Sequence, residues 1–479
     1  MSGDSSVFAR RNGGLNSQAM QSQALTLESH DYTGRQVRDL SATGATILRF
    51  WLPLLAIGGA IVAAQHRLDY ATFSAIEDTE DSDSFDLVAD LGSSSHLRQL
   101  SFITIGVLGA LLLAMPPAVQ VSVDRKLILL LSALCGWIVL SAVWSDDPEL
   151  SLKRSLLPLL TVVAALGTTK HWRPRELCAF TALITGFFVL LGVAVECRYG
   201  TFLSGDEYRF AGTLHPNDQA VNCAALCLAS LGMLGRSSIA ESGKQRWFWL
   251  TVFVVGMLFL MLTRSRTTTG AFLAALFVFC YLGTSGKTRV FATGCMVMVA
   301  AMILIVFAES EHGHHNLFIN VLTMGRDQDS DDITSLTGRI PIWEEVLYDI
   351  GKRPLGGYGY GAFWTPQRVL TYSYIHDWEF AHAHSAYFET LLNIGAIGLV
   401  VGLLLVMNAL WSAVRYYKMT EDRAYRFIAA IFTLALIHGL ADSNFVKVGF
   451  ASLIAVVCIS IVALHRVAES CAQPCETLN

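Results

Sequence analysis

Arginine, histidine and carboxylate side chains gather in four stretches of this sequence, and three of the four lie beside a long apolar run. An ionisable residue in or beside a membrane-spanning segment is energetically expensive, so it is a functional candidate by default. Arginine can donate two parallel hydrogen bonds to phosphate oxygens, and a neutral histidine can take a proton from a hydroxyl near neutral pH. Several arginines with a histidine therefore predict a site for a phosphate-bearing lipid headgroup. The stretches are 209–217, 262–267, 337–361 and 382–398.

The third stretch ends in a glycine-rich run at 354–361, which predicts tight turns. It does not predict a dinucleotide site, because no strand–helix unit surrounds it. The candidate residues of the four stretches are Arg209 and Asn217, then Arg264 and Arg266, then Arg339 and Trp343, and last His384, Tyr387 and Glu389.

Simpler interpretations of the same residues remain open. An arginine at the end of a span commonly extends to the lipid headgroups. On one helix, Arg264 and Arg266 would point about 200° apart, so at most one of them would face a given pocket. His382 and His384 could be ordinary polar loop residues.

The composition predicts an integral membrane protein. Of the 479 residues, 53% are hydrophobic and only 15% are charged, against about 25% charged in soluble domains. No basic stripe indicates nucleic-acid binding. The acidic run 327–332 does not complete a calcium loop, because Asp332 stands where glycine is needed and Gly338 where glutamate is needed. We therefore expect no metal site and no cofactor.

Apolar runs long enough to cross a bilayer predict an all-α polytopic protein with about twelve transmembrane helices. Backbone groups in lipid must be hydrogen-bonded within the segment, so these spans are helical. The predicted spans are 46–64, 101–120, 127–144, 154–169, 177–195, 217–234, 247–263, 267–283, 290–307, 386–408, 427–441 and 447–465.

Basic residues in short loops predict the orientation. Alternate connections carry the lysines and arginines and are expected in the cytoplasm, with both termini. The other connections are acidic or nearly neutral, including the run 77–90. The long connection 308–385 is expected to be an ordered outward loop, with Thr337 capping a helix over 338–350. The predicted regions are a disordered cytoplasmic tail at 1–45, an anchor helix and acidic outward loop at 46–100, a membrane catalytic domain at 101–465, and a cytoplasmic tail at 466–479.

In their order along the chain, these motifs resemble the O-antigen ligase and O-antigen polymerase superfamily, which includes exopolysaccharide polymerases. The resemblance covers roughly 100–465. One departure is Ser385, where the family usually has asparagine. The matching elements are Arg209, Gly212 and Asn217; Ser265-Arg266; Gly338-Arg339 with Trp343 and 354–359; and His384 with Phe388, Glu389 and Gly395.

The resemblance implies a metal-independent glycosyltransferase of the bacterial inner (cytoplasmic) membrane, with its active site facing the periplasm. The donor would be a glycan on undecaprenyl diphosphate. The acceptor would be a sugar hydroxyl, on lipid A core in a ligase or on a growing polysaccharide in a polymerase. If the matching residues have the roles that they have in the family, Arg209 and Arg266 would bind the diphosphate and His384 would be the base or an orienting group. The expected substrate-binding or supporting residues are Arg264, Arg339, Asn217, Glu389, Trp343 and Tyr387.

A transporter or flippase of lipid-linked glycans is the alternative, since it too would have many helices and outward arginines. Such a protein places polar groups near the bilayer midplane, in broken helices, often with internal repeats. The sequence shows no internal repeat, and its polar groups cluster at one predicted face.

Overall fold

The computed structural model describes residues 47–66, 96–117, 120–205, 208–234, 243–287, 339–376 and 382–466. The chain divides into two compact units, Met1–Leu55 and Ala56–Asn479. Of the first, the structure describes the π-helix η1 (Ile47–Trp51) and the first residues of α2. All other described elements belong to the second unit.

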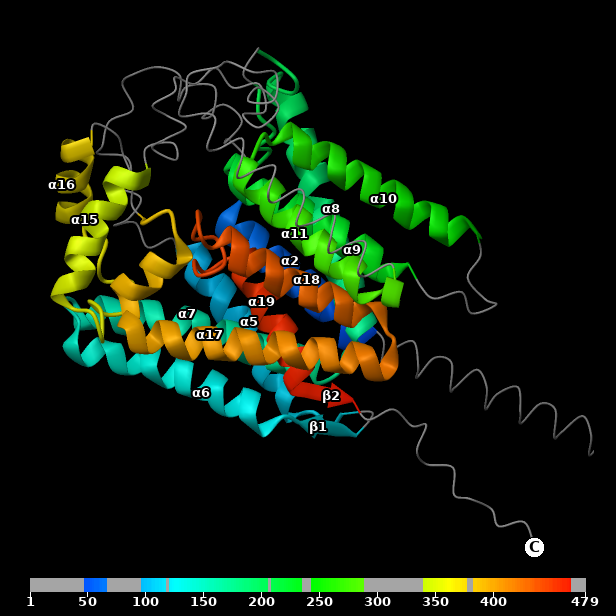
Figure 1. Cartoon of the computed structure of the whole chain (residues 1–479), viewed down its shortest axis with the longest axis horizontal. Coiled ribbons are helices and arrows are strands. Elements are labelled where there is room, and N and C mark those ends of the chain that lie inside the picture. Colours follow the sequence, from blue (N-terminus) through cyan, green and yellow to red (C-terminus); the bar gives the residue numbers. More distant parts are fainter. Residues whose placement is uncertain are drawn as a thin grey trace, which may run out of the picture. The chain divides into compact units, whose positions relative to one another are not determined.

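Helices dominate the described part of the chain (Figure 1). Several begin at side-chain caps: Asp124, Asp147 and Asp422 each accept a hydrogen bond from a backbone N–H of the following first turn. The elements are α2 (Leu52–Gln65), α5 (His96–Ala114), α6 (Arg125–Leu140), η2 (Ser141–Trp144), α7 (Pro148–Thr169), α8 (Pro174–Tyr199), α9 (Pro216–Met233), α10 (Gly243–Leu262), α11 (Arg266–Leu282), α15 (Arg339–Lys352), α16 (Pro366–His376), α17 (Ala386–Thr420), α18 (Arg423–His438) and α19 (Phe450–Ala463).

Each predicted span other than 290–307, which lies outside the described residues, overlaps a helix, although α5 ends at Ala114, before the end of the span predicted at 101–120. Among the described residues, five helices are long and apolar enough to cross a membrane. They are Arg125–Trp144, Pro148–Thr169, Pro174–Tyr199, Gly243–Leu262 and Ala386–Thr420. The chain is therefore a helical, multi-pass membrane protein, while the number of twelve spans stays a prediction.

Helix α9 is buried on nearly every side, because α8, α10, α11 and α18 all pack against it (Figure 1). Small side chains allow this close approach: alanine, cysteine, serine and glycine make up much of the helix. Close approach also joins α5 to α7, where a Cβ atom on Gly167 would lie 2.1 Å from the carbonyl oxygen of Gly109.

One feature departs from a wholly α-helical chain. Strands β1 (Val121–Val123) and β2 (Leu464–Arg466) pair antiparallel, with Ser122 opposite His465. The ribbon joins the segment before α6 to the end of α19. The last predicted span, 447–465, was therefore too long at its end, because the chain leaves the helix at Leu464 to pair with β1.

Helix α17 is broken at Gly395, whose φ of 67° and ψ of −173° are not helical. A residue with a side chain rarely adopts this conformation. A Cβ atom at this position would also lie 2.1 Å from the carbonyl oxygen of Leu355. Glycine is thus required at the break by both conformation and space.

The glycine-rich loop at 354–359 supplies the hydrogen bonds that the break removes from α17. The N–H groups of Ala396 and Ile397 donate to the carbonyls of Pro354 and Leu355, at 2.8 and 3.3 Å. On the other side, the N–H groups of Tyr358 and Gly359 donate to the carbonyls of Leu392 and Asn393, at 2.8 and 3.0 Å. The carbonyl of Ile394 accepts the indole N–H of Trp137 at 2.9 Å. These backbone groups would otherwise be unpaired in a weakly polar environment.

Residues 339–376 fold around an apolar core that they share with the start of α17, and this core includes Ile342, Val346, Phe363, Trp364 and Leu392. The helix predicted at 338–350 is confirmed as α15, although Thr337 lies outside the described residues. Tyr372 donates its hydroxyl to Asp349 at 2.6 Å. The pKa of Tyr372 is raised, mainly because the hydroxyl is buried and secondly because it lies beside this carboxylate. Residues 339–376 of the long connection are therefore folded, whereas residues 308–338 and 377–381 lie outside the described part.

Candidate active site

Arg209 lies in the segment between α8 and α9 and is half-buried. Its Nε donates to the carbonyl of Thr263 at 3.1 Å, and its Nη2 donates to Oδ1 of Asn217 at 3.2 Å. Asn217 stands in the first turn of α9, so its side chain orients the guanidinium. The backbone N–H of Phe210 also donates to the carbonyl of Leu262, at 2.8 Å. Arg209 is thereby fixed to the end of α10.

A buried carboxylate that the sequence analysis missed holds the Arg209 segment in place. Glu196, 3% exposed in the last turns of α8, accepts the backbone N–H groups of Ala211 and Gly212 at 3.0 and 2.6 Å. It also accepts the hydroxyl of Tyr208 at 2.5 Å. The pKa of Tyr208 is raised, mainly because the hydroxyl is buried and secondly because it lies beside the Glu196 carboxylate. The signal in the sequence was a lone acidic residue near the end of an apolar run.

The two arginines of the α10–α11 junction do not lie on one helix, so the expected angle of about 200° between them is wrong. Arg264 has a φ of 49° and forms the tight turn itself. This left-handed conformation is uncommon for a residue with a side chain. Arg266 is the first residue of α11, directly after Ser265. It thus stands at a helix N-terminus, where backbone N–H groups and the helix dipole favour an anion.

His384 also has a left-handed backbone, with a φ of 48°. The peptide groups of the preceding residue, Ala383, are held on both sides. Its N–H donates to Oε2 of Glu389 at 3.1 Å, and its carbonyl accepts the indole N–H of Trp343 at 2.9 Å. The ring of His382 lies 4.0 Å from that of His384. A strained backbone conformation persists only where contacts with the surrounding structure hold it in place. Residues of this kind cluster at functional sites.

The residues after His384 are fixed to the end of α18. The N–H of Ala386 donates to the carbonyls of Gly439 and Asp442, at 2.8 and 3.1 Å. Ser385 donates its hydroxyl to the carbonyl of Gly439 at 3.3 Å. Tyr387 donates its hydroxyl to the carbonyl of Leu436 at 2.7 Å, so it orients the first turn of α17.

Glu389 is buried, at 9% exposed, and its carboxylate accepts hydrogen bonds from three residues. Besides Ala383, the indole N–H of Trp364 lies 3.1 Å from both carboxylate oxygens, and Nδ2 of Asn393 lies 3.0 Å from Oε1. Glu389 therefore ties the folded 339–376 segment to the start of α17, directly beside His384. This is the geometry of a positioning residue.

A path of hydrogen bonds connects the Arg209 segment to the His384 segment. Thr263, which binds Arg209, accepts the N–H of Ser265 on its hydroxyl at 3.3 Å. Ser265 donates to the hydroxyl of Thr268 at 3.0 Å, and that hydroxyl contacts Nε2 of His438 at 3.1 Å. His438 ends α18, and the next residue, Gly439, binds Ser385 and Ala386. Segments far apart in the sequence thus form one connected region.

The candidate residues fall into two groups by their contacts. Arg209, Asn217 and the 263–266 junction form one group, and Trp343, His384, Tyr387 and Glu389 form the other. Arg339 begins α15, but its side chain lies outside the described residues. Sequence reasoning also missed Thr268 and His438, which join the two groups and are both fully buried. A histidine near the end of an apolar run was the available signal.

Comparison with known proteins gives two matches. The O-antigen ligase family model matches residues 251–403. This range includes Arg264, Arg266 and His384 and excludes Arg209. The exopolysaccharide production protein ExoQ of Rhizobium meliloti (strain 1021) is 24% identical over 303 residues, which cover 58% of this chain and 63% of that protein.

The range matched by the family contains α11, the folded 339–376 segment and the start of α17. Residues 251–403 of the chain are therefore similar to the O-antigen ligase family, and a longer part of the chain is similar to an exopolysaccharide production protein.

Proposed function

We propose that the chain is a membrane glycosyltransferase, a glycan ligase or polysaccharide polymerase that uses a polyprenyl-diphosphate-linked donor. The observation that carries this proposal is the connected region from Arg209, through the α11 N-terminus with Arg266, to the clamped His384. Two arginines and a helix N-terminus suit a diphosphate, and a histidine suits the proton of an attacking hydroxyl. The similarity of residues 251–403 to the O-antigen ligase family supports the same reaction class.

In the proposed reaction, the acceptor hydroxyl oxygen attacks the anomeric carbon of the donor sugar. A new C–O bond forms while the bond from that carbon to the diphosphate oxygen breaks. His384 takes the hydroxyl proton, and the diphosphate leaves with the bonding electron pair. Arg209 and Arg266 stabilise the charge that develops on the departing oxygen, where preorganised donors act most strongly.

The other candidate residues take supporting roles in this proposal. Asn217 orients Arg209, and Arg264 shapes the turn that places Arg266. Trp343 and Glu389 fix Ala383, and Tyr387 fixes the first turn of α17 against α18. Arg339 is proposed as a further contact for the substrate. All of these assignments are proposals and rest on the contacts given above.

We propose undecaprenyl diphosphate as the donor's carrier and the bacterial inner membrane as the location, with the site facing the periplasm. The acceptor is a sugar of lipid A core or of a growing polysaccharide. Topology is testable: a reporter fused after Gly313 should be active outside and one after Lys287 inside. Activity on the same side for both would contradict the proposed site location.

Transport of a lipid-linked glycan is the second candidate, and the break in α17 is the observation in its favour, because transporters use broken helices. In transporters, however, the freed backbone groups meet substrate or ions. Here they pair with the loop at 354–359 and with Trp137. The break therefore supports a fixed scaffold for His384 better than it supports a transport site.

The test of function is to delete the gene and examine the cell's surface glycan. Loss of glycan from its lipid anchor would support a ligase, and shortened chains would support a polymerase. A purified-protein assay complements this: labelled glycan should move from its diphosphate carrier to an acceptor with release of the carrier. Movement of the intact donor across vesicles without release would favour transport.

A further inference from the structure

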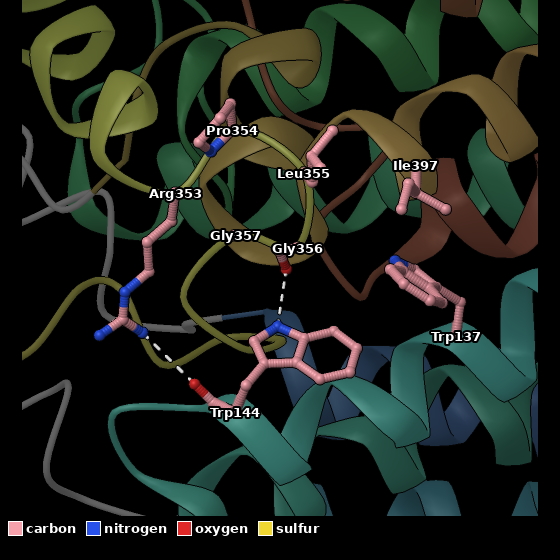
Figure 2. Close-up of a pocket in the computed structure, with 8 residues that line it drawn as sticks. All are labelled: Trp137, Trp144, Arg353, Pro354, Leu355, Gly356, Gly357 and Ile397. Carbon is pink, nitrogen blue, oxygen red and sulfur yellow. Dashed lines mark hydrogen bonds between the residues drawn. The ribbon is translucent and has the colours of Figure 1, made fainter.

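A groove of about 430 Å³ lies where the glycine-rich loop meets α6, η2 and α17. Figure 2 shows its eight lining residues, with the two indole rings on one side and the loop on the other. None of the candidate catalytic residues lines it. The lining residues are Trp137, Trp144, Arg353, Pro354, Leu355, Gly356, Gly357 and Ile397.

The hydrogen-bonding groups of the groove walls are largely used within the protein. Trp137 donates its indole N–H to the carbonyl of Ile394 at 2.9 Å, and Trp144 donates to the carbonyl of Gly356 at 3.0 Å. The two ring centroids lie 5.1 Å apart. What remains toward the groove is indole surface with the side chains of Leu355 and Ile397, which are 64% and 40% exposed.

This groove begins at the end of a candidate membrane span, Arg125–Trp144. Trp144 is the last residue of that span, and Trp137 is seven residues earlier, a rise of about 10 Å along a helix. Tryptophan is enriched where membrane helices reach the headgroup region. The groove thus extends from headgroup level toward the hydrocarbon region.

Positive charge stands at one end of the groove. Arg353 is the one charged residue among the eight that line it, and it pairs with Asp146 at 2.7 Å. The same carboxylate also pairs with Arg368, at 2.9 Å. Two guanidinium groups share one carboxylate, so this ion-pair cluster carries a net positive charge. The Arg353 side chain is 41% exposed and can therefore accept an anionic partner.

We propose that this groove binds one anionic phospholipid, with an acyl chain against Trp137 and Trp144 and the phosphate at Arg353. The chemistry of the walls favours lipid over a sugar. A sugar presents several hydroxyls that need partners, whereas a hydrocarbon chain needs none. The inference does not depend on the proposed glycosyl transfer, because it concerns a different set of residues.

Fluorescence quenching by brominated lipid tests the proposal on the purified full-length protein. The protein is reconstituted into vesicles of equal parts phosphatidylglycerol and phosphatidylcholine, with bromine on the chains of one lipid or the other. Two of the ten tryptophans line the groove, so the extra quenching by brominated phosphatidylglycerol should reach up to about a fifth of the emission. Equal quenching by both lipids would overturn the proposal.

Two charge variants locate the effect. Arg353→Gln should abolish the preference for phosphatidylglycerol. Lys352→Gln is the matched control, because this neighbouring side chain is 51% exposed and does not line the groove. It should keep the preference. Preference that survives in Arg353→Gln, or that disappears equally in Lys352→Gln, would overturn the proposal.

A third variant and two competitors complete the test. Asp146→Asn removes the shared carboxylate and should strengthen the preference; loss of preference would mean that the ion pairs only hold the loop, contrary to the proposal. Inorganic phosphate at constant ionic strength should not displace the lipid. Displacement by phosphate, or preferential displacement by a polyprenyl phosphate, would assign the groove to another ligand and overturn the phospholipid proposal.

Discussion

The carboxylate of Glu389 accepts the backbone N–H of Ala383 at 3.1 Å, while the indole of Trp343 donates to the carbonyl of the same residue at 2.9 Å. The two successive peptide groups that flank the Cα atom of Ala383 are thus each held by a side chain, immediately before His384. Because His384 has a φ of 48°, the chain needs such external bonds to keep this conformation. The position of the proposed base therefore depends on residues that do not need to touch the substrate.

Replacing Glu389 with glutamine should weaken this arrangement. A glutamine has one acceptor oxygen and adds an NH₂ donor, whereas the native carboxylate accepts from Ala383, Trp364 and Asn393. A buried donor left without an acceptor costs about 1–3 kcal/mol. We expect lower thermal stability and a fall in turnover. Thermal unfolding and glycan transfer measure both, with the exposed Glu344→Gln as control. Unchanged stability and turnover would contradict the role of Glu389.

A double-mutant cycle tests whether Trp343 and Glu389 act together on the backbone of Ala383. Trp343→Phe keeps an aromatic ring against Phe388, 5.4 Å away, and removes the N–H. Loss of one such bond costs about 0.5–1.5 kcal/mol. If both residues serve to fix Ala383, the effects of the two substitutions on turnover should be non-additive. Strict additivity would show that they act independently.

The contribution of Arg266 is separable into charge and geometry. Lysine keeps the charge and loses the planar fork. If Arg266 binds the diphosphate, Arg266→Lys should reduce turnover nearly as much as alanine, by on the order of 10²–10³ for loss of such a donor. If Arg266 only extends to lipid headgroups, lysine should be almost silent. The assay is transfer of labelled glycan from its carrier by purified variants.

Arg264 is the control for that experiment. It lies two residues earlier and belongs to the turn, with a φ of 49°. Arg264→Lys keeps the charge at this position, and we expect a mild effect. Severe loss at Arg264 with none at Arg266 would mean that Arg264 is the diphosphate ligand.

The break in α17 predicts opposite results at two glycines of one helix. Gly395→Ala should destabilise the protein, because its backbone conformation costs a residue with a side chain about 1–3 kcal/mol and its Cβ would meet Leu355. Gly402→Ala meets no atom within 4 Å and should be neutral or stabilising by about 0.5–1 kcal/mol. Thermal unfolding in detergent compares them. Equal stability of the two variants would argue against the break.

Metal dependence is a separate prediction. We expect glycan transfer by the purified protein to survive a chelator, because arginines are proposed to stabilise the leaving diphosphate. Activity is measured with and without chelator, at constant ionic strength. Complete loss that magnesium or calcium restores would instead point to the acidic run 327–332, which lies outside the described residues.

The helices of this protein, and its resemblance to the O-antigen ligase family, were predictable from residue types and spacing alone. A helix closes its own hydrogen bonds within four residues, so the length and polarity of each apolar run were enough to locate helices. Thus the spans predicted at 177–195 and 247–263 lie within or almost within α8 and α10. The order of short motifs was likewise readable from residue types and spacing.

The contacts that hold the candidate site in place became visible only in the tertiary structure. The sequence did not reveal that Glu196 binds the Arg209 segment, or that Arg264 forms a turn and not part of a helix. It also could not pair Trp137 with Ile394, 257 residues later. The reason is physical: a buried carboxylate or a broken helix needs partners, but chain folding chooses them from distant segments. Spacing along the sequence therefore suggested the candidate residues, and long-range packing set their conformation.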